Sequence, residues 1–281
     1  MYPSSNLAIF VLCALWVCAL QAGDELRWFK DGVPPDAIRE TAMPDTGDSR
    51  VGKILSRFYN KGLGGPENWE EIISMRSKGE IHLADGESME MEAYQRKPDR
   101  MKVILRNKGR AVLTLSYDGE SAWRQYAEPS KVQSMDATEA RRFIHSSMFG
   151  NHLLFPFAEG KKIEYLETIP IEQKVCHKLR VHLDTGYQVD YYIDVTSYHE
   201  RMVENVDRKT DKINTIHYRE YSMVSGMPMA MVLENFEDNK LVSTLELKDC
   251  RVNAGIMPWM FDMPEVAAGA SVGSKSSVPA P

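Results

Sequence analysis

Histidines and paired carboxylates are the residues of this sequence best suited to acid–base or metal chemistry, but their spacing assembles no site. His177 and His182 lie five residues apart in a segment with strand-like alternation. They therefore point to opposite faces of that strand and cannot share a metal ion. His177 has the parity of the apolar residues around it, which favours a core histidine over a functional one. Glu90 and Glu92 share a strand face, where solvent exposure explains them better than a general acid and base.

Short motifs give no indication of catalysis either. The H-E-x-x-H pattern of zinc proteases is absent from the sequence. Gly62-Leu63-Gly64-Gly65 follows a helical pattern instead of linking a strand to a helix, so we interpret it as a helix terminator and not as a phosphate-binding loop. We therefore expect no enzyme activity, no cofactor and no metal, and an enzyme of unrecognised type is the least favoured alternative.

Strands are the elements that must position any site in this protein. Between Ile73 and Tyr126, short segments alternate apolar and polar residues, which is the period of half-buried strands. Turn-forming pairs such as Asp85-Gly86 and Asp118-Gly119 separate these segments. The alternation returns from Lys162 to Val252, where about six further strands are predicted after the roughly five of the first region.

Two helices are predicted among the strands. Asp48 or Ser49 caps the first, which continues through Tyr59, and Asp136 followed by Glu139 is a capping-box arrangement that opens the second. The fold class is therefore mainly β (α+β). Nearly a dozen antiparallel strands must curl or close around a core, and the helices are expected to cover one face of the sheet.

Both ends of the chain differ in composition from the body. Residues 1–22 contain an apolar run from Leu7 to Leu20 and predict a signal peptide cleaved after Ala19 or Ala22, with an uncleaved membrane anchor as the alternative. Residues 23–47 predict an extended lead-in rich in Asp, Pro and Gly. Residues 265–281 are too poor in large apolar groups to pack, so we expect a disordered tail. The folded domain is expected to span 48–264.

Charge and cysteine content restrict the partners and the covalent structure. The net charge of −6, with no basic run, argues against a nucleic-acid partner. Loss of a signal peptide would leave two cysteines, Cys176 and Cys250. In an exported protein they could form one disulfide, and two separate small side chains on strands are the alternative.

Several short stretches carry a resemblance to a known family. Ser77-Lys78-Gly79-Glu80 leads into Lys97-Pro98-Asp99-Arg100 and Tyr117-Asp118-Gly119, Tyr221 precedes Ser225-Gly226-Met227-Pro228, and the body closes on Phe261-Asp262-Met263-Pro264. In this order they resemble the outer-membrane lipoprotein-sorting proteins of the LolA kind. The resemblance implies an incomplete antiparallel β-barrel, here of about eleven strands, with two or three helices covering its concave face around an apolar cavity for acyl chains. The long lead-in departs from the family pattern.

Methionine, present 16 times, suits the wall of such a cavity, because its flexible thioether adapts to exchangeable apolar contents. The alternative is that the methionines only fill a β core. The predicted lining residues are Met89, Met91, Met101, Val103, Leu105, Leu113, Leu115, Trp123, Tyr191, Ile193, Met229 and Met231.

The function implied by the resemblance is that of a periplasmic carrier. It would bind the acyl chains of lipid or lipoprotein without altering them, and would serve lipoprotein transport to the outer membrane. Membrane donor and acceptor proteins are the implied partners, and we expect a monomer. The alternative is an envelope regulatory or protein-binding module on the same scaffold, whose cavity is simply core.

Overall fold

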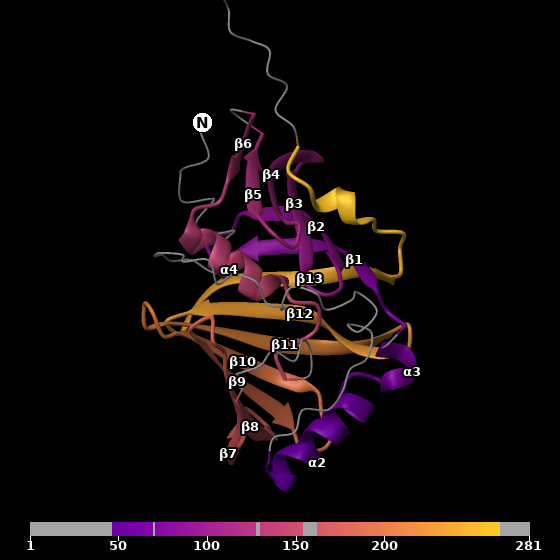
Figure 1. Ribbon diagram of the computed structural model, residues 1–281, viewed down its shortest axis with the longest axis vertical. Coiled ribbons are helices and arrows are strands. Elements are labelled where there is room, and N and C mark those ends of the chain that lie inside the picture. The colour runs from indigo at the N-terminus through magenta and orange to yellow at the C-terminus, as the bar shows by residue number, and fades with distance from the viewer. Residues whose placement is uncertain (1–46, 70, 128–129, 154–161, 265–281) are drawn as a thin grey trace, which may run out of the picture.

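A single antiparallel sheet forms the body of the protein (Figure 1). The computed structural model describes residues 47–69, 71–127, 130–153 and 162–264. Within these ranges, thirteen strands follow the order β6-β5-β4-β3-β2-β1-β13-β12-β11-β10-β9-β8-β7, and β6 and β7 are the open edges. The incomplete barrel inferred from the sequence is therefore confirmed. The predicted signal peptide, nearly all of the lead-in and the predicted tail lie outside the described residues.

Two meanders build this sheet. The first consists of β1 (Ser74–Leu83), β2 (Ser88–Arg96), β3 (Arg100–Asn107), β4 (Arg110–Tyr117), β5 (Ala122–Tyr126) and β6 (Lys131–Ser134). The second consists of β7 (Lys162–Ile171), β8 (Lys174–His182), β9 (Tyr187–Asp194), β10 (Glu200–Asp207), β11 (Lys212–Val224), β12 (Met227–Glu237) and β13 (Lys240–Val252). Pairing of β1 with β13 joins them, so residues more than 150 positions apart lie side by side at the centre of the sheet.

The two edge strands are those that the sequence pattern did not reveal. β6 has four residues and none of them is buried, so it has no apolar alternation to detect. β7 contains a bulge between Tyr165 and Glu167, which shifts the register against β8 and interrupts the period of two. The described sheet consequently has more strands than expected, with the same architecture.

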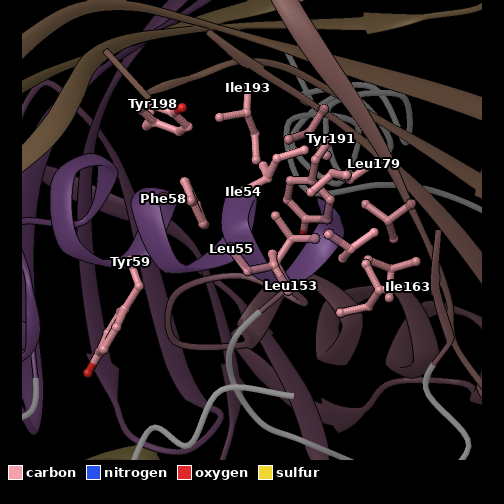
Figure 2. Close-up of a cluster of buried hydrophobic side chains, with 14 of the residues drawn as sticks. Ile54, Leu55, Phe58, Tyr59, Leu153, Ile163, Leu179, Tyr191, Ile193 and Tyr198 are labelled. Carbon is pink, nitrogen blue, oxygen red and sulfur yellow. The ribbon is translucent and has the colours of Figure 1, made fainter. Parts of the chain in front are cut away.

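The N-terminal helix α2 (Ser49–Arg57) packs against the end of the sheet that contains β7 to β9. Its N-cap is Asp48, whose carboxylate accepts hydrogen bonds from the backbone N–H groups of Arg50 at 2.7 Å and Val51 at 3.4 Å. The helix continues as the π-helical turn η2 (Phe58–Gly62), and the short α3 (Pro66–Trp69) follows. Figure 2 shows Ile54 and Leu55 from α2 and Phe58 from η2 among the side chains of the first hydrophobic core.

The second helix, α4 (Ala137–Ser147), covers the other half of the sheet (Figure 1). Asp136 is its N-cap and accepts from the N–H groups of Thr138 and Glu139. The reciprocal half of the expected capping box is not formed, because the Glu139 carboxylate accepts a 2.6 Å hydrogen bond from Arg124 of β5. α4 buries Phe143 and other apolar residues against β1 to β4, and these make the second hydrophobic core.

Cys176 and Cys250 are free thiols in the structure, so the possible disulfide is not formed. Cys176 lies on β8 and Cys250 on β13, and four strands separate them in the sheet order. Five strand spacings correspond to about 24 Å along the sheet, which is far beyond the reach of a disulfide.

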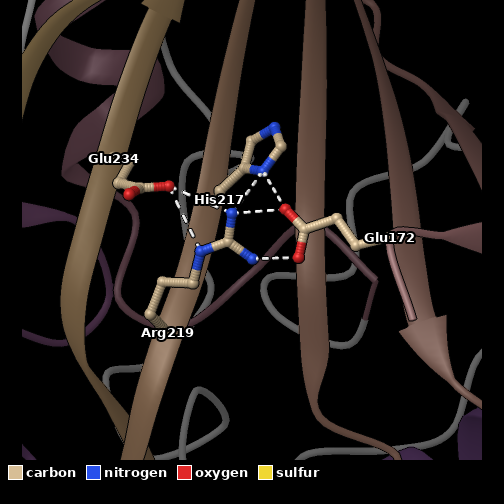
Figure 3. Close-up of polar contacts among 4 residues, drawn as sticks. All are labelled: Glu172, His217, Arg219 and Glu234. Carbon is tan, nitrogen blue, oxygen red and sulfur yellow. Dashed lines mark hydrogen bonds and ion pairs between the residues drawn. The ribbon is translucent and has the colours of Figure 1, made fainter. Parts of the chain in front are cut away.

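A polar cluster connects the β7–β8 turn to β11 and β12, from which β9 and β10 separate it in the sheet order. Arg219 of β11 contacts Glu172 of this turn and donates to the Glu234 carboxylate of β12 at 3.1 Å (Figure 3). His217 lies 3.5 Å from the same Glu172 carboxylate. All four side chains are partly exposed, so we expect the cluster to contribute about 1 kcal/mol or less per pair.

Candidate ligand cavity

A cavity of about 400 Å³ lies under the helices on the concave face and touches both hydrophobic cores. Its wall comes from β1 to β3 on one side and from β9 to β13 on the other, and is completed by η2 and by the segment that runs from the end of α4 to His152. Most of the lining side chains are apolar. Ligand cavities in proteins fall in the range of about 300–1,000 Å³, so this one is large enough for a small apolar molecule.

Five of the residues predicted from the sequence line this cavity. They are Met91, Met101, Val103, Tyr191 and Met229. The pairing of β2 with β3 sets Met91 opposite Leu105 and Gln95 opposite Met101, and this register turns the methionine faces of both strands toward the helices. Whether these side chains contact a ligand remains a prediction.

The other predicted residues lie elsewhere in the fold. Met89, Leu105, Leu113 and Leu115 are buried in the second core beneath α4, and Ile193 is buried in the first core. Met231 is half-buried on β12 and is not among the described lining residues. For the five buried residues, the predicted strand face is compatible with burial, and the helices fill the space over it.

Trp123 occupies the opposite face of the sheet. In the β4–β5 pairing it lies beside Ser116, whose side chain points away from the face that carries Leu115. Both the Trp123 indole N–H and the Ser116 hydroxyl donate 2.8 Å hydrogen bonds to the carbonyl of Phe261. The 3-10 helix η3 (Pro258–Phe261) therefore covers Trp123, and a cavity role for this residue is corrected to a structural one.

Polar residues that the sequence reasoning missed form one part of the cavity wall. His145 of α4 is buried, and its Nε2 lies 3.0 Å from the amide oxygen of Asn205 on β10. Its ring stacks on those of Tyr187 and His152, at centroid distances of 3.9 Å and 4.5 Å. Burial lowers the pKa of His145 to about 4, so the ring is neutral at physiological pH.

Glu200 is the one carboxylate among the described lining residues. A bulge between Glu200 and Met202 shifts the register of β10 against β9, and pairs Glu200 with the inward-facing Ile193. The simple parity of Val203 and Asn205 would have placed Glu200 on the other face, so no signal in the alternation could have found it. Burial raises the pKa of this carboxyl to about 7.

The described residues show no catalytic arrangement around the cavity. No group of three or more His, Cys, Asp or Glu side chains within those ranges could hold a metal ion. Gly269-Ala270-Ser271-Val272-Gly273 matches the letters of the G-x-S-x-G nucleophile motif, but it lies outside the described residues. That motif works at a strand-to-helix turn of an α/β sheet, whereas the pairings of the described sheet are antiparallel. The wall can enclose a ligand.

Comparison with known proteins supports the fold but not a close relationship. No protein-family profile matches the chain, and no curated protein matches its sequence. A domain assigned as an outer membrane lipoprotein-sorting protein, from Vibrio parahaemolyticus, superposes with a TM-score of 0.53 at 16% identity, over 75% of this chain and 95% of that one.

Two further solved structures superpose on this protein with similar scores. A LolA superfamily protein from Nitrosomonas europaea gives a TM-score of 0.54 at 11% identity, over 75% of this chain and 97% of that one. A DUF1329 family protein from Desulfovibrio piger gives 0.57 at 9% identity, over 76% and 96%. The protein therefore has a LolA-like fold, as the sequence resemblance indicated. At these identities the likeness concerns the fold alone.

Within the described ranges, no helix has both the length and the apolar character needed to cross a membrane.

Proposed function

We propose that this protein is a periplasmic carrier that holds acyl chains of lipid or lipoprotein in the cavity and delivers them without chemical change. The observation that carries the proposal is the apolar cavity of about 400 Å³ between the concave sheet and its helices. Burial contributes about 0.8 kcal/mol per methylene, so a chain of about ten carbons supplies several kcal/mol toward binding. The predicted signal peptide supports export, and the LolA-like fold supports the carrier class.

A matched pair of methionine substitutions tests the cavity. Met229 lines it, whereas Met223 is 65% exposed on β11 and lies outside the described lining. The chain is expressed with its first 22 residues, purified from a periplasmic extract and weighed by native mass spectrometry, and bound lipid is identified after denaturation. We expect bound lipid in wild type and in Met223→Arg, and its loss in Met229→Arg, because a guanidinium in the apolar wall excludes the chain.

A second experiment offers purified, lipid-free protein possible ligands and asks whether the cavity binds them. Wild-type protein that remains unliganded when mixed with phospholipid and with an acylated peptide would overturn the proposal. Near-UV circular dichroism of Met229→Arg identifies a folding defect, in which case Ala230→Met, which narrows the same wall, replaces it.

A second candidate function is a protein-binding module in the envelope, and exposed apolar side chains favour it. Trp259 of η3 is 68% exposed and its N-cap Met257 is 50% exposed, on the segment that covers Trp123. On this reading, Trp259→Ser would abolish capture of a protein partner while leaving lipid content unchanged. Retained partner binding in that variant would count against it.

A further inference from the structure

Glu200 is chemically out of place in a cavity that only stores hydrocarbon. Its Oε1 atom is buried and has no hydrogen-bond partner among the described residues. The residue as a whole is half-buried, since its side chain borders the open space of the cavity. No lysine or arginine is among the described lining residues, so none of them neutralises the carboxylate. Leaving such a group unpaired costs free energy, which a ligand could recover.

Three phenol rings share the cavity wall with this carboxyl group. Tyr191 comes from β9, and Tyr218 and Tyr221 come from β11; all three are within electrostatic range of Glu200. The Tyr221 hydroxyl donates a 2.6 Å hydrogen bond to the Glu200 carbonyl, and the Tyr191 hydroxyl accepts one of 2.9 Å from the backbone N–H of His152. These bonds fix the rings of Tyr221 and Tyr191 beside the acidic group.

Aromatic faces and a carboxylate are together the protein environment that binds an alkylammonium ion. The ring faces carry negative quadrupole charge that attracts cations, and the carboxylate supplies a full opposite charge. A ligand carboxylate would be repelled by the same site, and a hydroxyl could donate a hydrogen bond to Glu200 but would bring no opposite charge. We infer that the cavity selects amphiphiles whose apolar chain carries an amine, with the ammonium group seated between Glu200 and the rings of Tyr191, Tyr218 and Tyr221. This inference rests on the proposed function and specifies its ligand class.

The protonation of Glu200 fits this role. With a pKa of about 7, the carboxyl ionises near neutrality, and a bound ammonium favours the ionised form. The titratable groups that face it are the phenols of Tyr191, Tyr218 and Tyr221, all with pKa values raised by burial and hence neutral here. His145 and His152 are the other titratable groups among the described lining residues.

Three probes of equal chain length, used below their micelle concentrations, separate charge from hydrophobicity: dodecylamine, dodecanol and dodecanoate. Isothermal titration calorimetry of the purified mature protein at pH 8 is expected to give an affinity for dodecylamine about ten-fold or more above that for dodecanol, since the ammonium adds an opposite charge beside the carboxylate that the neutral hydroxyl lacks. Dodecanoate is expected to bind more weakly than dodecanol. In Glu200→Gln, which keeps the shape of the side chain, the amine and alcohol should bind within about two-fold of each other.

A pH series gives a readout that simple loss of packing would not reproduce. In wild type the ratio of amine to alcohol affinity should rise between pH 5.5 and pH 8, while dodecanol binding stays level. Equal affinities for amine and alcohol in wild type, or an unchanged preference in Glu200→Gln, would overturn the inference and leave the carrier proposal standing. Failure of all three probes to bind would overturn both together.

Discussion

The guanidinium of Arg141 on α4 contacts the carboxylate of Asp207 at the end of β10 at 2.5 Å, with both side chains buried. This ion pair ties the helix that covers the first meander to a strand of the second. The Asp207 carboxylate also accepts a 2.9 Å hydrogen bond from the backbone N–H of Lys209 in the following turn. The cavity lies between the elements that the pair joins, because His145 and Asn205 of the same helix and strand both line it.

Breaking this pair from one side should be costly. Arg141→Met leaves the Asp207 charge buried without its cation, and we expect the free energy of unfolding to fall by about 3–5 kcal/mol. Adding Asp207→Asn removes the buried, unpaired negative charge, so the double variant should be more stable than Arg141→Met alone. Urea denaturation measures both. The exposed Arg208→Ala is the control and should change stability by less than about 0.5 kcal/mol; a similar loss there would refute a specific role for the ion pair.

The architecture followed from the sequence because apolar alternation and turn residues are local signals. Met91, Met101 and Val103 were placed on the cavity face from strand parity together with the family resemblance, and the structure puts all three in the lining. Leu113 and Leu115 have the same inward parity, yet α4 lies on them. Parity shows which side chains of a strand share a face. Whether an inward-facing side chain packs in the core or lines the cavity depends on where the helices lie, which is a property of the tertiary structure.

One wrong prediction, for Trp123, and one missed residue, Glu200, have a common physical origin. Trp123 follows directly after Ala122, and only one of two neighbouring strand residues can face inward; the β4–β5 register gives that position to Ala122, opposite Tyr117. Glu200 faces inward through a bulge that has no sequence signature. Register and bulges are fixed by pairing between strands, so single-strand periodicity could not determine either.

Glu200 should make the unliganded protein less stable as the pH rises toward neutrality. Its folded-state pKa of about 7 lies above the value of about 4.3 for an unfolded chain, so the folded state binds the proton more tightly between these values. The stability this provides is complete at low pH and is lost as the pH rises through about 7. The free energy of unfolding of Glu200→Gln should therefore rise by about 3 kcal/mol relative to that of wild type as the pH increases from 4 to 8. Urea denaturation at each pH measures this difference. A pH-independent difference would contradict a buried, titrating carboxyl.

His145 should act in the opposite direction. Its folded-state pKa of about 4 lies below the unfolded value of about 6.5, so the unfolded chain binds the proton more tightly. The stability due to neutral His145 is complete above pH 6.5 and is lost as the pH falls toward 4. In wild type the two residues partly cancel between about pH 4.3 and 6.5. His145→Gln should expose the slope due to Glu200, and Glu200→Gln the slope due to His145. Parallel pH profiles for the two variants would exclude this assignment.

Two glycines of the N-terminal helical segment make a matched test of close packing. A Cβ on Gly62 would lie 2.2 Å from the carbonyl oxygen of Tyr198, which is backbone and cannot move aside cheaply. A Cβ on Gly52, in the middle of α2, meets no atom within 4 Å. We expect Gly52→Ala to raise the free energy of unfolding by about 0.5–1 kcal/mol through helix propensity, and Gly62→Ala to lower it by about 1–3 kcal/mol.

Because Gly62 also lines the cavity, its substitution has a second consequence. Separation of η2 from Tyr198 should weaken retention of a bound chain, whereas Gly52→Ala should leave the lipid content measured by native mass spectrometry unchanged. Equal stability and equal lipid content in the two variants would show that η2 is not held as closely to the sheet as the 2.2 Å approach requires. The pair thus connects one backbone contact to both the stability of the fold and the closure of the cavity.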